Sequence, residues 1–253
     1  MNDATGAPLT VELRSDHIAV ITLDRPHAIN AIDSAMVRAL RAAFRAVEEA
    51  PDIHVMVLCA SGGRGFCAGV DLKERQRMTD AEALAFRTDE ILPMFGELDR
   101  RTKPAIAAVF GHVLGGGLEM ALCCDLIVAA DDARFGLPEA RWGMVPAASG
   151  CRKLPAVVGP ALAREMILTS QSIDAQRALN AGLVSRVVPC NSEWGAAMEL
   201  AALVASNVPS AVRAAKSCID DAIGTPAVSA FDLAAVEAVY SSGDSRRGIE
   251  KFR

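Results

Sequence analysis

Hydrophobic positions follow two different spacings along the first 60 residues, and each spacing predicts a different element. Residues 11–13 and 17–23 alternate apolar and polar positions, which predicts two short strands joined by a hairpin turn at 14–16. After Asp33 or Ser34, apolar residues recur every three or four positions, which predicts a capped amphipathic helix. The residues on its apolar face are Met36, Leu40, Phe44 and Val47.

A strand followed by a glycine-rich loop occurs twice in the chain. The β-branched run at 55–59 predicts a buried strand, and the first loop follows it at 61–69. The second copy has a strand at 105–109, a loop at 111–117, a helix at 118–124 and a further strand at 126–130. Between the copies, residues 80–100 are typical of an uneven, polar helical segment that is mobile over a site. This alternation predicts an α/β fold.

The last third of the chain is mostly helical. Asp174 predicts the N-cap of a helix at 175–181, Gly182 predicts its end, and residues 184–188 predict the last strand. Residues 192–252 predict three or four helices, with breaks near Pro209, Thr225-Pro226 and Gly243. We therefore expect two regions, an α/β core over residues 1–190 and a C-terminal helical region over residues 191–253.

Composition excludes several classes of protein. The chain has 253 residues, of which 51% are hydrophobic, which is enough to form a large core. Its formal net charge is −5, so the sequence predicts no basic surface for binding nucleic acid or anionic lipid. The apolar stretch 104–130 is long enough to suggest a membrane helix. It contains Glu119, Asp125 and four glycines, which favours a buried core segment.

Seven cysteines occur without a CxxC pattern or a neighbouring histidine cluster, so neither a disulfide framework nor a zinc site is predicted. The first residues also lack the charged and apolar regions of a secretory signal. We therefore expect reduced thiols, no metal and a cytoplasmic location.

The two glycine-rich loops are the first candidate site. In SGGRGFCAGVDL at 61–72, missing side chains allow the backbone to approach a ligand, although a simple tight turn explains the same pattern. Gly63, Gly65 and Ala68 also match a dinucleotide-binding fingerprint, which leaves an NAD-dependent oxidoreductase open. With the second loop, GHVLGGGLEMAL at 111–122, each loop can aim one backbone N–H at a developing oxyanion.

Two glutamates accompany these loops. Glu119 is in the first turn of a helix within the most apolar part of the chain, and Glu139 follows the compact turn FGLP. Either can be structural, as a partner of the helix dipole or as an ordinary surface carboxylate. Two carboxylates near one oxyanion site, with separated pKa values, suit acid/base chemistry on a water molecule. Cys67 is an alternative nucleophile, but no base is evident beside it.

Together these segments resemble the enoyl-CoA hydratase/isomerase (crotonase) family over nearly the whole chain. The segments are LDRPHAINAID at 23–33, GRGFCAGVDL at 63–72, KPAIAAVFGHVLGGGLEMAL at 103–122, FGLPEARWGMVP at 135–146 and DAQRALNAGLVSRVVP at 174–189. The resemblance implies a crotonase-like fold of repeated ββα units with a C-terminal helical region that builds homotrimers, often paired into hexamers.

The resemblance also implies an acyl-CoA thioester substrate. Ala68 and Gly116 would donate the two N–H groups to its carbonyl oxygen. The expected CoA-binding and substrate-binding positions are Arg25, Ala28, Ala68, Gly69, Val70, Asp71, Leu72, Gly115 and Gly116. Glu119 would activate a water for attack at Cβ, and Glu139 would exchange the proton at Cα. No cofactor is implied, because coenzyme A is part of the substrate.

Hydration of a trans-2-enoyl-CoA is therefore the expected reaction. A Δ3,Δ2-enoyl-CoA isomerase or another acyl-CoA reaction of the family is the nearest alternative. A non-catalytic acyl-CoA-binding or assembly partner is the alternative of another class. It is suggested by two departures from the family pattern. Residues 146–150 read PAASG instead of PGAGG, which leaves the amide of Ala147 to hold the water, and the chain ends soon after Arg247-Gly248 and Phe252.

Overall fold

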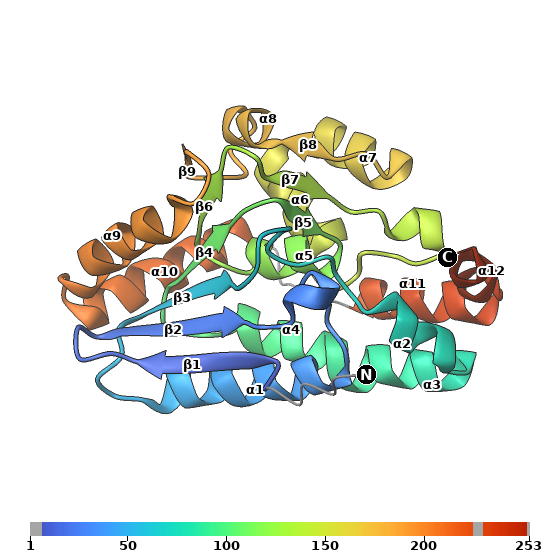
Figure 1. Ribbon diagram of the computed structural model, residues 1–253, viewed down its shortest axis with the longest axis horizontal. Helices are drawn as coiled ribbons and strands as arrows, with labels where there is room; N and C mark the ends of the chain where they lie inside the picture. The colour runs from blue at the N-terminus through green and yellow to red at the C-terminus, as the bar shows by residue number, and fades with distance from the viewer. Residues whose placement is uncertain (1–6, 225–229, 252–253) are drawn as a thin grey trace.

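The computed structural model describes residues 7–224 and 230–251. Its main sheet has six strands in the order β1-β2-β3-β4-β6-β9 (Figure 1). The strands are β1 Leu9–Leu13, β2 Ile18–Leu23, β3 Val55–Ala60, β4 Ala105–Val109, β6 Leu126–Ala130 and β9 Arg186–Val188. β1 pairs antiparallel with β2, and every other pairing is parallel. The second sheet contains β5 His112–Leu114, β7 Arg134–Gly136 and β8 Ile173–Asp174. The predicted α/β class is confirmed.

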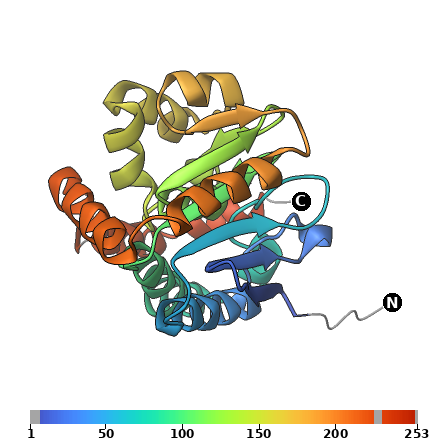
Figure 2. The same cartoon turned by 90° about the vertical axis from the view of Figure 1, so that its left-hand side faces the viewer.

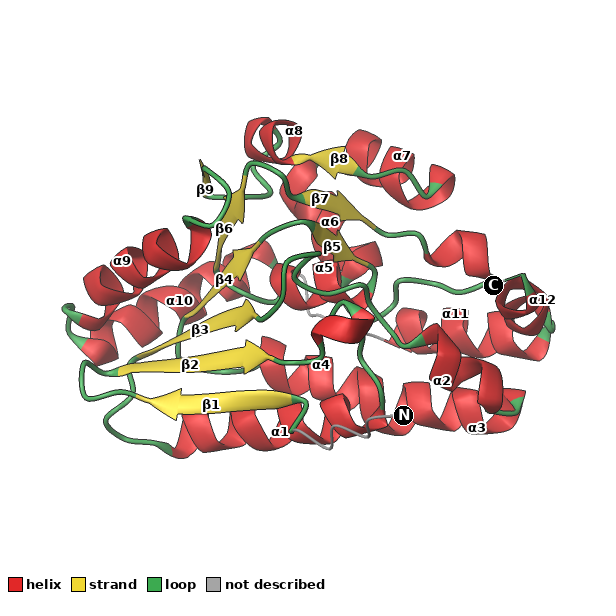
Figure 3. Cartoon of the chain, in the orientation of Figure 1, coloured by secondary structure: helices red, strands yellow, loops and turns green. Residues whose placement is uncertain are grey.

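Twelve α-helices, two 3₁₀ turns and one π-helix occur in the described parts of the chain (Figure 3). The first six helices are α1 Ser34–Glu49, α2 Leu72–Arg77, α3 Asp80–Ala85, α4 Leu92–Asp99, α5 Gly116–Leu122 and α6 Gly150–Val158. The others are α7 Pro160–Thr169, α8 Ala175–Asn180, α9 Glu193–Ala205, α10 Pro209–Ile223, α11 Ala230–Ser241 and α12 Asp244–Glu250. The 3₁₀ turns are η1 Pro26–Ala28 and η3 Glu139–Trp142, and the π-helix is η2 Phe86–Ile91.

Side chains along a strand alternate between the two faces of the sheet, and strands β2, β3, β4 and β6 are buried on both faces. The edge strand β1 is mostly exposed. One face packs on Ala197 and Ala201 of α9, which lies across the parallel strands in Figure 2. Its residues are Ile18, Val20, Val55, Val57, Ile106, Ala108 and Val128. The other face belongs to the main core together with the predicted apolar face of α1. Asp33 caps α1, as predicted, by accepting a hydrogen bond from Met36 N at 2.8 Å.

Several elements differ from the sequence prediction. The second glycine-rich loop contains β5, and α5 begins at Gly116 instead of residue 118. The last strand covers Arg186–Val188, two residues less than predicted. The strands β7 and β8 were not predicted, because two or three residues carry too little periodicity to be recognised. The apolar stretch 104–130 is, as predicted, part of the buried core.

Residues 80–100 are helical, as predicted, but form three consecutive helices with η2 in the middle. Arg87 and Ile91 of η2 are buried. In the C-terminal region, α9 packs on the main sheet, α11 contacts α3, and α12 contacts both α2 and η3. The boundary at residue 190 therefore stays a prediction. The break expected at Thr225-Pro226, like Phe252, lies outside the described residues.

No single helix in the described part of the chain is long and apolar enough to cross a membrane. The pair α9 and α10 meets the length and composition test only together, and the two helices are bent by 108° at their junction.

Candidate active site

The two glycine-rich loops are joined by backbone hydrogen bonds. These bonds connect Phe66 N to Phe110 O (2.9 Å), Cys67 N to His112 O (3.1 Å) and Leu114 N to Cys67 O (2.9 Å). Gly117 allows this approach, since a Cβ there would lie 2.4 Å from Cys67 O. Residues 65–67 thus pair with residues 111–113, and the next helix begins only at Leu72. The strand–turn–helix context of a dinucleotide fingerprint is not formed.

A third segment, residues 25–33, holds the first loop in place. Asn30 is fully buried; its Oδ1 accepts from Arg25 N at 2.8 Å and its Nδ2 donates to Ser61 O at 3.0 Å. The guanidinium of Arg25 forms ion pairs with Asp33 (3.0 Å) and Asp71 (3.2 Å). Arg25 was predicted to line the CoA path. In the structure its guanidinium is held by Asp33 and Asp71.

The structure brings the two predicted oxyanion loops together. A Cβ on Gly69 would lie 3.1 Å from Gly116 N, so the backbones after Ala68 and Gly115 are in contact. Gly116 is the first residue of α5, where an N–H has no intrahelical partner. The N–H of Ala68 donates to Ile29 O at 2.9 Å. Of the other predicted substrate positions, Ala28, Val70, Asp71 and Leu72 are partly exposed beside these loops, whereas Gly69 is buried.

Glu119 is completely buried and is bound at the start of α6. Its Oε1 accepts three backbone hydrogen bonds, from the N–H groups of Ala148 (2.8 Å), Ser149 (2.9 Å) and Gly150 (3.0 Å). Such unpaired N–H groups at a helix N-terminus stabilise negative charge. The N–H of Ala147, predicted to hold the water, instead donates to Val145 O at 2.9 Å. The segment PAASG at 146–150, which differs from the family pattern, therefore forms a turn whose N–H groups bind the Glu119 side chain.

Glu139 opens the turn η3 and is also buried. Its Oε1 lies 2.9 Å from the place where a Cβ on Gly115 would stand, directly beside the second loop. Burial, followed by the negative charge of Glu119, raises the pKa of Glu139 to about 8, while the charge of Arg87 opposes this rise. Burial and the neighbouring charge therefore favour the protonated form of Glu139, while three N–H donors at Glu119 favour its carboxylate.

Cys67 does not have the properties of a catalytic thiol. It is fully buried, its Sγ donates to Asn30 O at 3.1 Å, and burial raises the pKa of the thiol to about 12. Among the described residues, no group of three or more His, Cys, Asp or Glu side chains could hold a metal ion.

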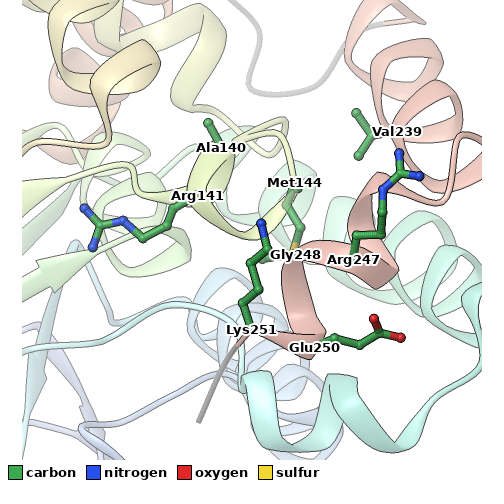
Figure 4. Close-up of a pocket in the computed structure, with 9 residues that line it drawn as sticks. Ala140, Arg141, Met144, Val239, Arg247, Gly248, Glu250 and Lys251 are labelled. Carbon is green, nitrogen blue, oxygen red and sulfur yellow. The ribbon is translucent and has the colours of Figure 1, made fainter.

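An open pocket of about 650 Å³ lies between η3 and α12. Arg141, Arg247 and Lys251 contribute its positive charges, and Figure 4 shows these side chains pointing in different directions from the pocket wall. Gly248 of α12 packs on η3 so closely that a Cβ there would lie 2.1 Å from Trp142 O. The last described helix therefore forms part of the wall next to the glutamate turn.

Comparison with known proteins identifies the fold and the family of this chain. The fold is the crotonase fold: a solved enoyl-CoA hydratase of Bacillus anthracis matches with a TM-score of 0.82 and 34% identity, over 93% of this chain and 90% of that one. The family description "Enoyl-CoA hydratase/isomerase" matches residues 14–253. A Bacillus subtilis (strain 168) protein assigned to this family is 37% identical over 251 residues, 98% of this chain and 96% of that protein. The 2,3-dehydroadipyl-CoA hydratase of Escherichia coli K12 is 39% identical over 206 residues, 81% of this chain and 79% of that protein. The chain belongs to the enoyl-CoA hydratase/isomerase family.

Sequence reasoning missed two parts of this site. The amides of Ala148, Ser149 and Gly150 were not predicted as partners of Glu119, although the start of a helix after Pro146 was a usable signal. Arg87, whose charge acts on Glu139, was not singled out, because its burial depends on the packing of η2.

Proposed function

We propose that this protein is an enoyl-CoA hydratase, which adds water across the 2,3 double bond of a trans-2-enoyl-CoA thioester. The observation that carries the proposal is the pair of buried glutamates beside two backbone loops, with three N–H donors on Glu119 and none comparable on Glu139 among the described residues. Membership of the family is consistent with an acyl-CoA substrate. A hydratase needs both a base for the water and an acid for the new C–H bond, and this pair supplies both.

In this mechanism Glu119 accepts a proton from water while the water oxygen forms a bond to Cβ. The electrons of the double bond move to the thioester carbonyl, which becomes an enolate. Glu139 then gives its proton to Cα, on the face of the double bond that the water has attacked, which makes the addition syn. The proton on Glu119 returns to Glu139 through solvent, which restores the starting state.

The N–H groups of Ala68 and Gly116 would stabilise the enolate oxygen. In the structure Ala68 N–H donates to Ile29 O, so the thioester oxygen would replace or share that acceptor. Removing one donor from an oxyanion site typically costs about 3 kcal/mol of transition-state stabilisation.

Steady-state hydration of crotonyl-CoA, followed by loss of the conjugated thioester absorbance, tests the proposal. We expect the wild type to turn over and Glu119→Gln and Glu139→Gln each to lose activity by about 100- to 10,000-fold. Glu193→Gln is a matched control, since Glu193 is a buried glutamate on α9, outside the site, and its variant should keep wild-type rates. Wild-type rates in both site variants would refute the assigned roles.

An isomerase is distinguished by its need for a single base. With a 3-enoyl-CoA substrate, isomerisation that survives Glu119→Gln but not Glu139→Gln would replace the hydratase assignment. Saturable acyl-CoA binding without turnover of either substrate would identify a non-catalytic binding partner.

We further propose a cytoplasmic homotrimer or dimer of trimers that uses no cofactor apart from the CoA of its substrate. Large apolar side chains exposed on and between α9 and α10 support association through this region: Leu203, Val208, Ile219 and Ile223. Light scattering of the purified chain measures the assembly directly.

A further inference from the structure

A small cavity is enclosed by α2, α3, η2 and α11. Its apolar wall includes Met78, Phe86, Ile91 and Met144. Met144 donates through its N–H to the carbonyl of Glu139 at 3.0 Å. The cavity measures about 20 Å³, roughly the space that one water molecule needs. Methionine side chains are flexible, so Met78 and Met144 can turn to admit a longer group.

Four charged residues line this cavity, and three of them already have partners of opposite charge or hydrogen-bond partners. Arg75 donates to Asp80 at 2.9 Å and lies over the ring of Tyr240 at 5.2 Å. Asp71 is paired with Arg25 at 3.2 Å. The Oε1 of Glu74 accepts from the hydroxyl of Ser34 at 2.7 Å.

Arg87 is the fourth charged residue, and among the described residues it has a neutral hydrogen-bond partner but no ion pair. The residue is buried, at 7% exposure, and Nη2 donates to the carbonyl of Val145 at 3.1 Å. It forms no ion pair with any residue in the described ranges 7–224 and 230–251. The charge of Arg87 opposes the rise in the pKa of Glu139, so Arg87 lies near the candidate active site, but the two side chains form no ion pair.

We propose that Arg87 binds a carboxylate carried at the far end of the acyl chain, so that the preferred substrate is an enoyl-CoA with a second, free carboxyl group. This inference rests on the proposed hydratase function and specifies its substrate class. A buried cation without an anion is costly, and a carboxylate from the substrate compensates it. Guanidinium groups bind carboxylates through paired N–H donors, which the remaining donors of Arg87 allow.

The apolar wall completes the site. Phe86 and Ile91 flank Arg87 in η2, so methylene groups between the double bond and the carboxylate pack on apolar side chains. π-Helical turns of this kind often occur at functional sites, since the extra residue turns a side chain to a new direction. The distance from the reacting carbon atoms to Arg87 thus determines which acyl chain length is preferred.

Paired substrates of equal length test the inference. The kcat/KM for trans-2-pentenedioyl-CoA is compared with trans-2-pentenoyl-CoA, and that for trans-2-hexenedioyl-CoA with trans-2-hexenoyl-CoA. We expect the wild type to prefer the carboxylate substrate at one or both lengths by about 10- to 100-fold, the range of one charge-assisted interaction. If neither member of a pair is hydrated, the hydratase proposal fails. If the uncharged members are hydrated as well or better at both lengths, only the present inference fails.

Variants of Arg87 separate recognition from a structural role. In Arg87→Met the ratio of the two kcat/KM values should fall to about one or below, and in Arg87→Lys part of the preference should return. Arg75→Met is the matched control, because Arg75 lines the same cavity but is already paired with Asp80, so the ratio should stay near that of the wild type. An equal loss on both substrates in Arg87→Met, with an unchanged ratio, would overturn the inference. If Arg87→Met does not fold, the wild-type ratio and Arg87→Lys still decide it.

Discussion

Replacing Glu119 by alanine or by glutamine separates its structural role from its chemical role. Alanine removes the acceptor of three buried N–H groups, those of Ala148, Ser149 and Gly150. Each buried donor left without a partner costs about 1–3 kcal/mol, and a water in the vacated space recovers part of this loss. We expect a net loss of about 3 kcal/mol in the free energy of unfolding for Glu119→Ala.

Glutamine keeps a carbonyl oxygen in the place of Oε1, so the three hydrogen bonds remain. It also removes the negative charge that acts on Glu139. The stability of Glu119→Gln should therefore lie within about 1 kcal/mol of the wild type, while its hydration rate falls as far as that of Glu119→Ala.

Urea unfolding and crotonyl-CoA hydration measure the two effects on the same preparations, at one protein concentration because an oligomer's stability depends on it. Equal stability of the alanine and glutamine variants would show that the three amides do not depend on Glu119. Hydration retained in the glutamine variant would show that Glu119 is not the base.

The remaining predictions concern Glu139, its neighbour Gly115, and Gly195 on α9. Because the acid form of Glu139 is needed, kcat/KM should fall tenfold per pH unit above about 8, and it should also fall in acid, where the base Glu119 takes up a proton; a profile that stays level to pH 10 would contradict this. The pKa of Glu139 is raised above its ordinary value of 4.5, so the folded state binds this proton more tightly than the unfolded state. The stabilisation from this proton is complete below about pH 4.5 and is lost as the pH rises through about 8. Glutamine does not titrate, so the stability of Glu139→Gln should not fall in this way. The difference between its urea midpoint and that of the wild type should therefore shift in favour of the variant between pH 5 and pH 8. Gly115→Ala should lose at least about 1 kcal/mol of stability and most activity, since its φ is +54° and the added Cβ would lie 2.9 Å from Glu139 Oε1. Gly195→Ala on α9, where a Cβ meets no atom within 4 Å, should instead stabilise the protein by up to about 1 kcal/mol.

Elements with strong local signals could be predicted from the sequence. The helix α1 has a four-residue apolar face and a capping Asp33, and both signals come from neighbouring residues. By contrast, β5 and β7 are three residues long and exist because each pairs with the other. The same holds for η2, whose buried Arg87 gives no apolar periodicity. Local patterns cannot specify elements that depend on distant partners.

The oxyanion loops were predicted as a pair, and their contact was not. Their backbones meet because Asn30, from a third segment, fixes the first loop through hydrogen bonds to Arg25 N and Ser61 O. The expectation that the amide of Ala147 holds the water stays a prediction; in the structure this N–H donates to Val145 O, and the next three N–H groups, which were not predicted as partners, donate to Glu119.

The different roles of the two glutamates follow from their surroundings. Glu119 accepts three N–H groups at the start of α6, and this environment favours a carboxylate. Glu139 is buried without comparable donors and near the charge of Glu119, and both effects raise the pKa of its carboxyl group. Exchanging the two assignments would place the base where negative charge is least stabilised. The direction of proton transfer in the proposed hydration is therefore determined by the helix terminus at Gly150, about 30 residues from Glu119 in the chain.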